Sequence, residues 1–305
     1  MLRSGATLAA MKIVVTGGSG QIGRWVVRRL ADDGHEVLNL DLVRPPVGAP
    51  GRYLHTDVGR RDVAEPRIAE FGAEALCHLG ELPDKGRDLE ERVYGRNATS
   101  TGALLMSAAD AGVKRVVYAS SVQVYGQFGI GGSQGEFPPL PPLRLPLDES
   151  EPPRPWNGYG AQKVGAEQFL ASLCRRRGMV GVSLRLPWVA KPGDGRWMRP
   201  GRRSHGKVNE LGAYLAVQDA ASAFAAALAL DAPAGSSHVF HLAAEDVRPD
   251  ATDRPIREAL AADWPEFPPL PGDWPERRCP LSIDAFRAAT GWRPTLAAAD
   301  LDDGK

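Results

Sequence analysis

The 305-residue chain has few cysteines, no net charge and no long apolar run. Its three cysteines, Cys77, Cys174 and Cys279, are far apart and match neither a disulfide framework nor a metal motif, which favours a reducing, cytoplasmic location. The 37 basic and 37 acidic residues cancel, so no charge excess attracts nucleic acid or an anionic membrane. No apolar run approaches the roughly 18 residues that a membrane span needs. We therefore predict no metal, no nucleic acid and no membrane among its partners.

The most informative pattern lies near the N-terminus. An apolar run at residues 13–15 breaks into glycines and resumes at helical spacing over residues 22–30, which is the order strand, tight turn, helix. Glycines let the backbone approach a ligand, and the helix N-terminus offers free N–H groups and a positive dipole end to a pyrophosphate. Asp41 closes the next apolar run, where a carboxylate that binds ribose hydroxyls is expected. The stretch predicts a dinucleotide site, and Asp41 favours NAD over NADP, although Arg44 weakens that preference.

Strand and helix patterns alternate through the first two thirds of the chain, which predicts an α/β fold with a doubly wound parallel sheet of the Rossmann type. We expect residues 1–10 to form a disordered tail and residues 11–187 to form the NAD-binding domain. Residues 188–305 should form mainly a small C-terminal substrate-binding lobe. One or two segments of that part, at about 211–243, are expected to return to the first domain.

Residues with acid–base chemistry lie at predicted strand and helix ends. Ser121 follows an apolar strand, and Tyr159 and Lys163 open a helix at i, i+4 spacing, which puts both on one face. A phenol with a pKa of about 10 is a poor base at neutral pH, but a nearby ammonium and a nicotinamide cation both favour the phenolate. Tyr159 can then exchange the proton of a carbinol during hydride transfer, while Ser121 polarises the same oxygen.

In this order the motifs resemble the NAD-dependent epimerase/dehydratase family, the extended branch of the short-chain dehydrogenase/reductase superfamily. Residues 16–23 are similar to its nucleotide fingerprint, Tyr159 and Lys163 to its catalytic pair, and Ser121 stands at the position of its catalytic Ser or Thr. The resemblance implies that these three residues are catalytic. It also implies a cofactor site made of Gly17, Gly20, Gln21, Ile22, Gly23, Asp41, Asp57, Val58, Leu79, Gly80, Asn97, Ala119, Tyr159, Lys163 and Pro187.

Departures from the family pattern reduce the number of reaction types that the chain could catalyse. After the catalytic Ser or Thr, the 4,6-dehydratases of the family carry an Asp–Glu pair, and its decarboxylases have a Glu two residues on. Val122 and Gln123 stand at these positions, and neither transfers a proton. Dehydration and decarboxylation are therefore disfavoured.

The substrate side also departs from relatives that act on nucleotide sugars. Trp188 and Gly212 replace an Asn and an Arg that contact the diphosphate there. Because charge-assisted pairs are the strong ones, their loss favours a free sugar or uronic acid as much as a nucleotide sugar, with Arg202 or Arg203 available as substitutes. We expect substrate contacts at Glu81, Gln123, Trp188 and Arg202.

Several polar residues have structural explanations beside functional ones. A helix is predicted to begin at Asn97, which is either its N-cap or a cofactor contact. Glu167 lies four residues after Lys163, which predicts an i, i+4 ion pair. His78 and His241 lie in apolar runs and are expected in the core or at strand ends.

Three functions stay open at this point. The leading hypothesis is an NAD-dependent oxidoreductase that acts on a secondary alcohol or carbonyl of a sugar or sugar-acid-like substrate, with Tyr159 as the acid/base. The first alternative is a nucleotide-sugar 4-epimerase, which uses the same groups but returns the hydride to the opposite face. The second is a catalytically silent NAD-binding sensor or structural protein. We also expect a homodimer, because helices at 97–111 and 159–177 form a four-helix interface in relatives.

Overall fold

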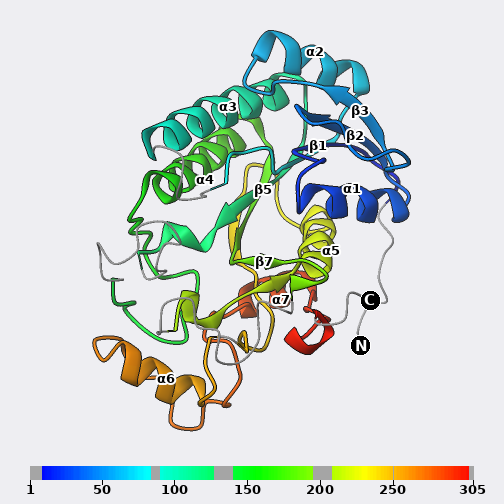
Figure 1. The fold of residues 1–305 in the computed structure, drawn as a ribbon. Coiled ribbons are helices and arrows are strands. Elements are labelled where there is room, and N and C mark those ends of the chain that lie inside the picture. Colours follow the sequence, from blue (N-terminus) through cyan, green and yellow to red (C-terminus); the bar gives the residue numbers. More distant parts are fainter. Residues whose placement is uncertain (1–8, 84–89, 127–139, 195–207, 250, 302–305) are drawn as a thin grey trace.

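The computed structural model describes residues 9–83, 90–126, 140–194, 208–249 and 251–301 (Figure 1). The predicted disordered tail lies almost wholly outside these residues, and so does Arg202, one of the predicted substrate contacts.

A parallel sheet of seven strands organises the molecule, in the order β3-β2-β1-β4-β5-β6-β9 (Figure 1). The chain builds outward from β1 to β3 and then crosses over to β4, so the strand order reverses between β1 and β4. Ligands of such sheets bind outside the carboxyl ends of the strands at this switch point. The predicted doubly wound α/β fold is confirmed. The strands are β1 (Lys12–Thr16), β2 (Glu36–Asp41), β3 (Arg52–His55), β4 (Ala75–His78), β5 (Arg115–Ser121), β6 (Val180–Leu186) and β9 (Ser237–His241).

Helices cover both faces of the sheet, with α1 and α5 on one face and α2, α3 and α4 on the other (Figure 1). Alternate residues of β1 show why. Ile13 packs into the cluster that contains Leu30 of α1, and its neighbour Val14 packs into the cluster that contains Leu104 of α3. Strands buried on both faces read as continuous apolar runs. The helices are α1 (Gly23–Asp32), α2 (Arg61–Phe71), α3 (Glu90–Asp110), α4 (Gly158–Arg177), α5 (Val217–Leu228), α6 (Ile256–Asp263) and α7 (Asp284–Thr290).

Beyond β6 the chain alternates between the large sheet and a group of elements outside it that includes α6 and α7 and is named the C-terminal lobe here. The short strands β7 (Val189–Ala190) and β8 (Leu215–Ala216) pair in parallel, while α5 packs against α1 and β9 joins the edge of the large sheet at β6. Tilted aromatic rings connect this edge to α7, since the ring of Phe286 lies 5.2 Å from that of Phe240 and 5.4 Å from that of Trp292.

The start of α3 corrects one prediction. The described helix spans Glu90–Asp110 and does not begin at Asn97, which lies buried inside it. The Asn97 amide accepts a hydrogen bond from the N–H of Leu82 and donates one to its carbonyl, both at 2.9 Å. Buried Val93 and the acidic first turn extend the helix toward its N-terminus, which outweighs the capping preference of asparagine.

Among the described residues, no helix is long and apolar enough to cross a membrane, and no group of three or more histidines, cysteines or acids could hold a metal ion. All three cysteines are buried and free. Burial raises the pKa of Cys174 to about 11 and that of Cys279 to about 12, so these thiols stay protonated at neutral pH. His78 and His241 are fully buried, as predicted.

Candidate active site

The glycines after β1 are required by the backbone. Gly17 has a φ of +68°, and a Cβ there would lie 2.7 Å from the backbone of Leu79 and Gly80 at the end of β4. A Cβ on Gly23 would lie 2.0 Å from the carbonyl oxygen of Gly17, and one on Gly20 3.1 Å from the same oxygen. The turn therefore holds β1, β4 and the start of α1 together. In the first turn of α1 the N–H of Arg24 donates to the carbonyl oxygen of Gly20 at 3.2 Å and that of Trp25 donates to the carbonyl oxygen of Ile22 at 2.9 Å. The N-terminus of α1, with its positive dipole end, lies at the switch point.

Asp41 completes this part of the site from the neighbouring strand. One carboxylate oxygen accepts a hydrogen bond from the N–H of Ser19, and the other accepts from the N–H of Val43, both at 2.9 Å. These bonds fix the carboxylate at the end of β2, beside the glycine turn. A helix N-terminus with a fixed carboxylate next to it is the arrangement that suits a pyrophosphate and an adenosine ribose.

The Gly23→Ala variant is expected to lose about 3 kcal/mol of unfolding free energy or more, and to lose NADH binding, since the clash is with backbone and no flexible side chain can move away. Urea unfolding and NADH fluorescence titration measure both. The matched control is Gly95→Ala in α3, where the added Cβ meets nothing within 4 Å. The control should gain about 0.5–1 kcal/mol from the lower chain entropy of alanine. Equal stability of the two variants would contradict the close packing of the turn.

The structure brings Tyr159 and Lys163 together at the start of α4. Their helix begins after Asn157, whose side chain accepts a hydrogen bond from the N–H of Gly160 at 2.7 Å. The Nζ atom of Lys163 lies 5.2 Å from the centre of the Tyr159 ring and donates to the carbonyl oxygen of Ala119 in β5 at 2.6 Å. The i, i+4 spacing therefore places Tyr159 and Lys163 close together on one face of the helix, as predicted. The carbonyl of Ala119 helps to hold the ammonium.

Ser121 ends β5 and lies in the segment that packs against the start of α4. Its hydroxyl oxygen accepts a hydrogen bond from the N–H of Gln123 at 3.1 Å. A Cβ on Gly160 would lie 2.3 Å from the carbonyl oxygen of Gln123, so this glycine allows the first turn of α4 to approach the segment after Ser121. The Gln123 side chain accepts from Asn157 at 3.2 Å.

Glu81 is the main site residue whose surroundings the sequence did not predict. Its side chain is 5% exposed and forms an ion pair with Lys163, whose side chain is 4% exposed. Burial alone would lower the pKa of the Lys163 ammonium and raise that of the Glu81 carboxyl. Their mutual attraction reverses both shifts, so the pKa of Lys163 lies well above its usual value and that of Glu81 lies below. The feature of the sequence that could have indicated this role is the acidic residue itself, three residues after the central strand β4.

The predicted ion pair between Glu167 and Lys163 is wrong. Glu167 instead pairs with Arg185 of β6, with Nε to Oε1 at 3.0 Å and Nη2 to Oε2 at 2.7 Å, and it accepts from the Ser120 hydroxyl at 2.5 Å. Both carboxylate and guanidinium are buried. The face of α4 that carries Glu167 packs on β6, whereas Lys163 lies one turn earlier, over β5 and near the end of β4.

The remaining predicted residues lie around the same edge of the sheet. The Gln21 side chain donates to the carbonyl oxygen of Val189 at 2.9 Å and so connects the glycine turn to β7. Asp57 lies just past β3 and accepts from the N–H of Gly59 at 3.0 Å. The ring of Trp188 lies beneath the guanidinium of Arg248, 5.5 Å away. The other predicted cofactor contacts that follow strand ends or open α1 are Ile22, Val58, Leu79, Gly80 and Pro187.

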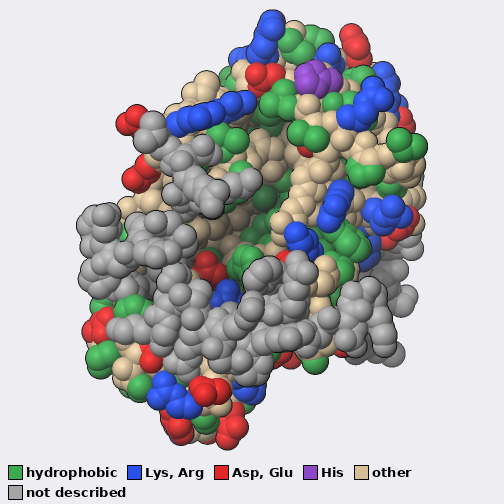
Figure 2. All heavy atoms as spheres, viewed as in Figure 1, with side chains coloured by type: hydrophobic (Ala, Val, Ile, Leu, Met, Phe, Trp, Pro, Cys, Tyr) green, Lys and Arg blue, Asp and Glu red, His purple; other side chains and the backbone are tan. Residues whose placement is uncertain are grey.

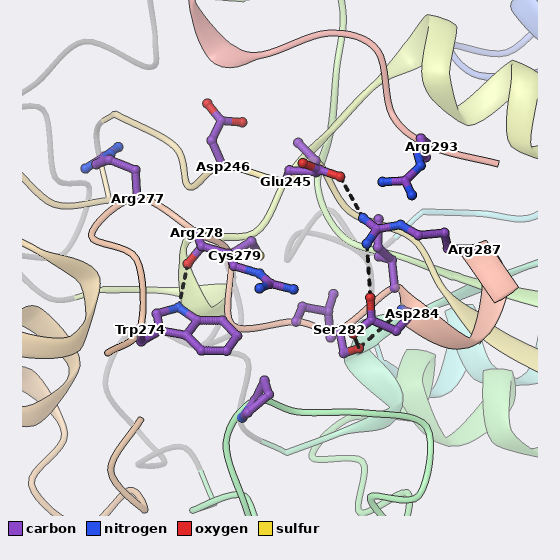
Figure 3. Close-up of a pocket in the computed structure, with 14 residues that line it drawn as sticks. Glu245, Asp246, Trp274, Arg277, Arg278, Cys279, Ser282, Asp284, Arg287 and Arg293 are labelled. Atoms are coloured by element: carbon purple, nitrogen blue, oxygen red, sulfur yellow. Dashed lines mark hydrogen bonds and ion pairs between the residues drawn. The ribbon is translucent and has the colours of Figure 1, made fainter. Parts of the chain in front are cut away.

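The surface seen in Figure 2 is hollowed near its centre, between the part that carries α3 and α4 and the part that carries α1 and α5. A separate cavity of about 480 Å³ lies in the C-terminal lobe (Figure 3). Among its charged lining residues, Arg287 contacts Glu245 at 2.6 Å and Asp284 at 3.2 Å. The guanidinium of Arg278 lies over the ring of Trp274. None of the three proposed catalytic residues lines it, so it is distinct from the site at the switch point.

The classification follows from a family model. The model of the NAD dependent epimerase/dehydratase family matches residues 13–243. The chain belongs to this family. The resemblance inferred from the motifs is thereby confirmed, and membership places the chain among NAD-dependent enzymes of the extended short-chain dehydrogenase/reductase type.

Individual members similar to this chain carry epimerase names. A UDP-glucose 4-epimerase of Corynebacterium glutamicum is 30% identical over 181 residues, which cover 57% of this chain and 50% of that protein. One from Mycolicibacterium smegmatis is 28% identical over 327 residues, which cover 95% and 96%. The solved UDP-glucose 4-epimerase of Thermotoga maritima, with UDP-glucose, has a TM-score of 0.68 at 22% identity and covers 95% of this chain and 96% of that one. The chain spans about half the length of the first relatives that it matches.

Proposed function

We propose that this protein is an NAD-dependent oxidoreductase that transfers hydride at a secondary carbinol or carbonyl of a sugar or sugar-acid-like substrate. The observation that carries the proposal is the position of Lys163, whose ammonium is fixed by Ala119 5.2 Å from the Tyr159 ring in a member of an NAD-dependent family. A phenol beside a fixed ammonium exchanges a proton more readily than a free phenol.

The residues at the switch point fit NAD. The glycines allow β1, β4 and the start of α1 to approach closely, and the Asp41 carboxylate is fixed beside the turn. This arrangement suits a pyrophosphate at the N-terminus of α1 and a ribose at Asp41. When bound there, NAD supplies the nicotinamide that accepts or returns the hydride. Asp41 accepts hydrogen bonds from ribose hydroxyls, and Lys163 has one N–H left for the ribose on the nicotinamide side.

Binding should favour NADH over NADPH, because the Asp41 carboxylate repels a 2′-phosphate. Fluorescence titration of the wild type should give at least a tenfold lower dissociation constant for NADH. The Asp41→Asn variant should lose most of this preference, since the amide keeps the shape and removes the charge. An Asn variant that still discriminates as the wild type does would show that the preference arises elsewhere, for example at Arg44.

Three side chains divide the chemistry between them. The Tyr159 phenolate takes the carbinol proton during oxidation, and the resulting phenol returns it during reduction. Lys163 stabilises the phenolate and contacts the ribose, and Ser121 donates a hydrogen bond to the reacting oxygen. Neither Val122 nor Gln123 can act as a second acid or base, so the proposed reaction is hydride transfer without dehydration or decarboxylation.

A nucleotide-sugar 4-epimerase is the second candidate, and the names of the similar proteins favour it. Gly212 stands at the position where nucleotide-sugar relatives have an arginine, and the absence of that arginine favours a smaller substrate. Gly212 has a φ of +71°, and a Cβ there would lie 3.1 Å from Val247. An arginine at this position would be strained, so the diphosphate contact would have to come from elsewhere.

The test is an assay with NAD and a panel of free sugars, uronic acids and nucleotide sugars. The absorbance of NADH monitors the redox reaction, and chromatography identifies the products. A dehydrogenase accumulates NADH with oxidised product, whereas an epimerase interconverts sugars without net NADH. A protein that binds NAD but converts no member of the panel is the silent binding protein of the second alternative, and that result would overturn the proposal.

A homodimer and a cytoplasmic location stay predictions. In the structure α3 and α4 lie side by side (Figure 1), and the residues of α3 that are exposed or half-buried include the small or short Ala98, Thr99 and Gly102. Such surfaces allow helices from two subunits to pack closely. Light scattering at micromolar concentration should give the mass of two chains, and the mass of one chain would contradict the dimer.

A further inference from the structure

A buried polar cluster surrounds the carboxylate of Glu81. Besides Lys163, it accepts hydrogen bonds from Thr101 of α3 at 2.5 Å, Gln162 of α4 at 2.8 Å and Tyr118 of β5 at 3.1 Å. A carboxylate accepts about four hydrogen bonds, so these donors nearly saturate it. Glu81 is therefore held from three separate elements and cannot readily turn toward the cleft.

The ammonium of Lys163 is held just as completely. It has three N–H donors. Glu81 and the Ala119 carbonyl take two, which leaves one for a ligand. A lysine side chain has many rotamers, and this pairing removes that freedom before any ligand binds.

We propose that Glu81 is a positioning residue that keeps Lys163 charged and fixed beside Tyr159. Its catalytic consequence rests on the proposed function, but the pairing itself does not. A buried ammonium without a counter-charge would lose its proton at a lower pH than in the wild type or would leave the site. Glu81, predicted from the sequence as a substrate contact, is thus assigned the role of holding Lys163.

The other charged or titratable groups around Lys163 do not replace Glu81. Tyr118 lies 4.8 Å from the ammonium, measured to its ring centre, and burial raises the pKa of its phenol well above the usual value, so it is neutral. Burial lowers the pKa of His78 to about 4, so it is neutral as well. Tyr159, from the same helix, is the group that the ammonium serves. Among the described residues, Glu81 is thus the one anion in contact with Lys163.

The test replaces Glu81 by Gln, which keeps the shape and removes the charge, and follows the urea midpoint as a function of pH. In the wild type the pKa of Lys163 is raised on folding, so its stabilisation persists up to the unfolded pKa of about 10.4. In the variant burial lowers that pKa below the unfolded value, so the unfolded state binds more protons and stability rises with pH. The deficit of Glu81→Gln against the wild type should therefore be largest near neutral pH and shrink toward about pH 10.

A second variant separates charge from shape. Adding Lys163→Met to Glu81→Gln removes both buried charges and should restore much of the lost urea midpoint, because an apolar side chain needs no counter-charge. A deficit that does not change with pH, or that the second substitution only deepens, would overturn the proposal. Asp33→Asn in the exposed pair with Arg29 is the control and should show neither effect.

The catalytic consequence is read from the pH profile of kcat. Glu81→Gln should add a loss of turnover on the alkaline side, where the variant's Lys163 becomes neutral, and the wild type should lack it. A profile identical to that of the wild type would overturn the role in catalysis. If the wild type turns over no substrate, the proposed function fails, and the two unfolding experiments still decide the role of Glu81.

Discussion

The Tyr159→Phe variant is expected to lose turnover by a factor of about 10² to 10⁴ and to keep its affinity for NADH within about twofold. The substitution removes one hydroxyl and leaves the ring beside Lys163, so the cofactor site is unchanged while the proton of the carbinol has no acceptor. Steady-state kinetics and NADH fluorescence titration measure the two quantities separately.

The matched control is Tyr94→Phe, which removes a hydroxyl from a side chain on α3 that is 47% exposed. It should leave both quantities as they are in the wild type. If Tyr159→Phe retained more than about a tenth of the wild-type turnover, another group would be the acid/base. If it lost NADH affinity together with turnover, the residue would serve binding and not proton transfer.

The Glu167→Gln variant is expected to lose about 3–5 kcal/mol of unfolding free energy, because it leaves the buried guanidinium of Arg185 without a counter-charge. The pair joins α4 to β6, and α4 carries Tyr159 and Lys163, so the variant should also lose activity as it unfolds. Urea unfolding followed by tryptophan fluorescence gives the free energy.

The exposed pair of Arg29 and Asp33 provides the comparison. Its partners are 44% and 34% exposed, and Asp33→Asn should cost at most about 1 kcal/mol. A cost for Glu167→Gln as small as that of the control would mean that the buried pair contributes little and that apolar packing alone holds α4 on β6.

Local patterns predicted the parts of the fold that depend on local chemistry. The glycine turn needs small residues at fixed positions, so its strand, turn and helix were recognisable from residues 13–30. Parallel strands covered on both faces are apolar along their whole length, and β5 shows this pattern. The spacing of Tyr159 and Lys163 was sufficient to place both on one face of α4.

Long-range packing produced what the sequence did not predict. Lys163 has two acidic neighbours in principle, Glu167 four residues along and Glu81 at a separation of 82 residues, and it pairs with the distant one. Helical spacing alone made Glu167 the nearer candidate. The choice depends on which strand lies under each turn of α4, and β6 provides Arg185 for Glu167. The spacing of residues along the sequence does not show which strand lies under each turn of a helix.

The most direct measurement compares free and nucleotide-linked forms of the same sugars, glucose and glucuronic acid with their UDP derivatives, in the presence of NAD. Hydride transfer from a free sugar-like substrate to NAD predicts that, with the free form, NADH accumulates in proportion to oxidised product in the wild type and not in Tyr159→Phe. Interconversion of the UDP derivatives without NADH, or NADH formation that survives the loss of the Tyr159 hydroxyl, would contradict it.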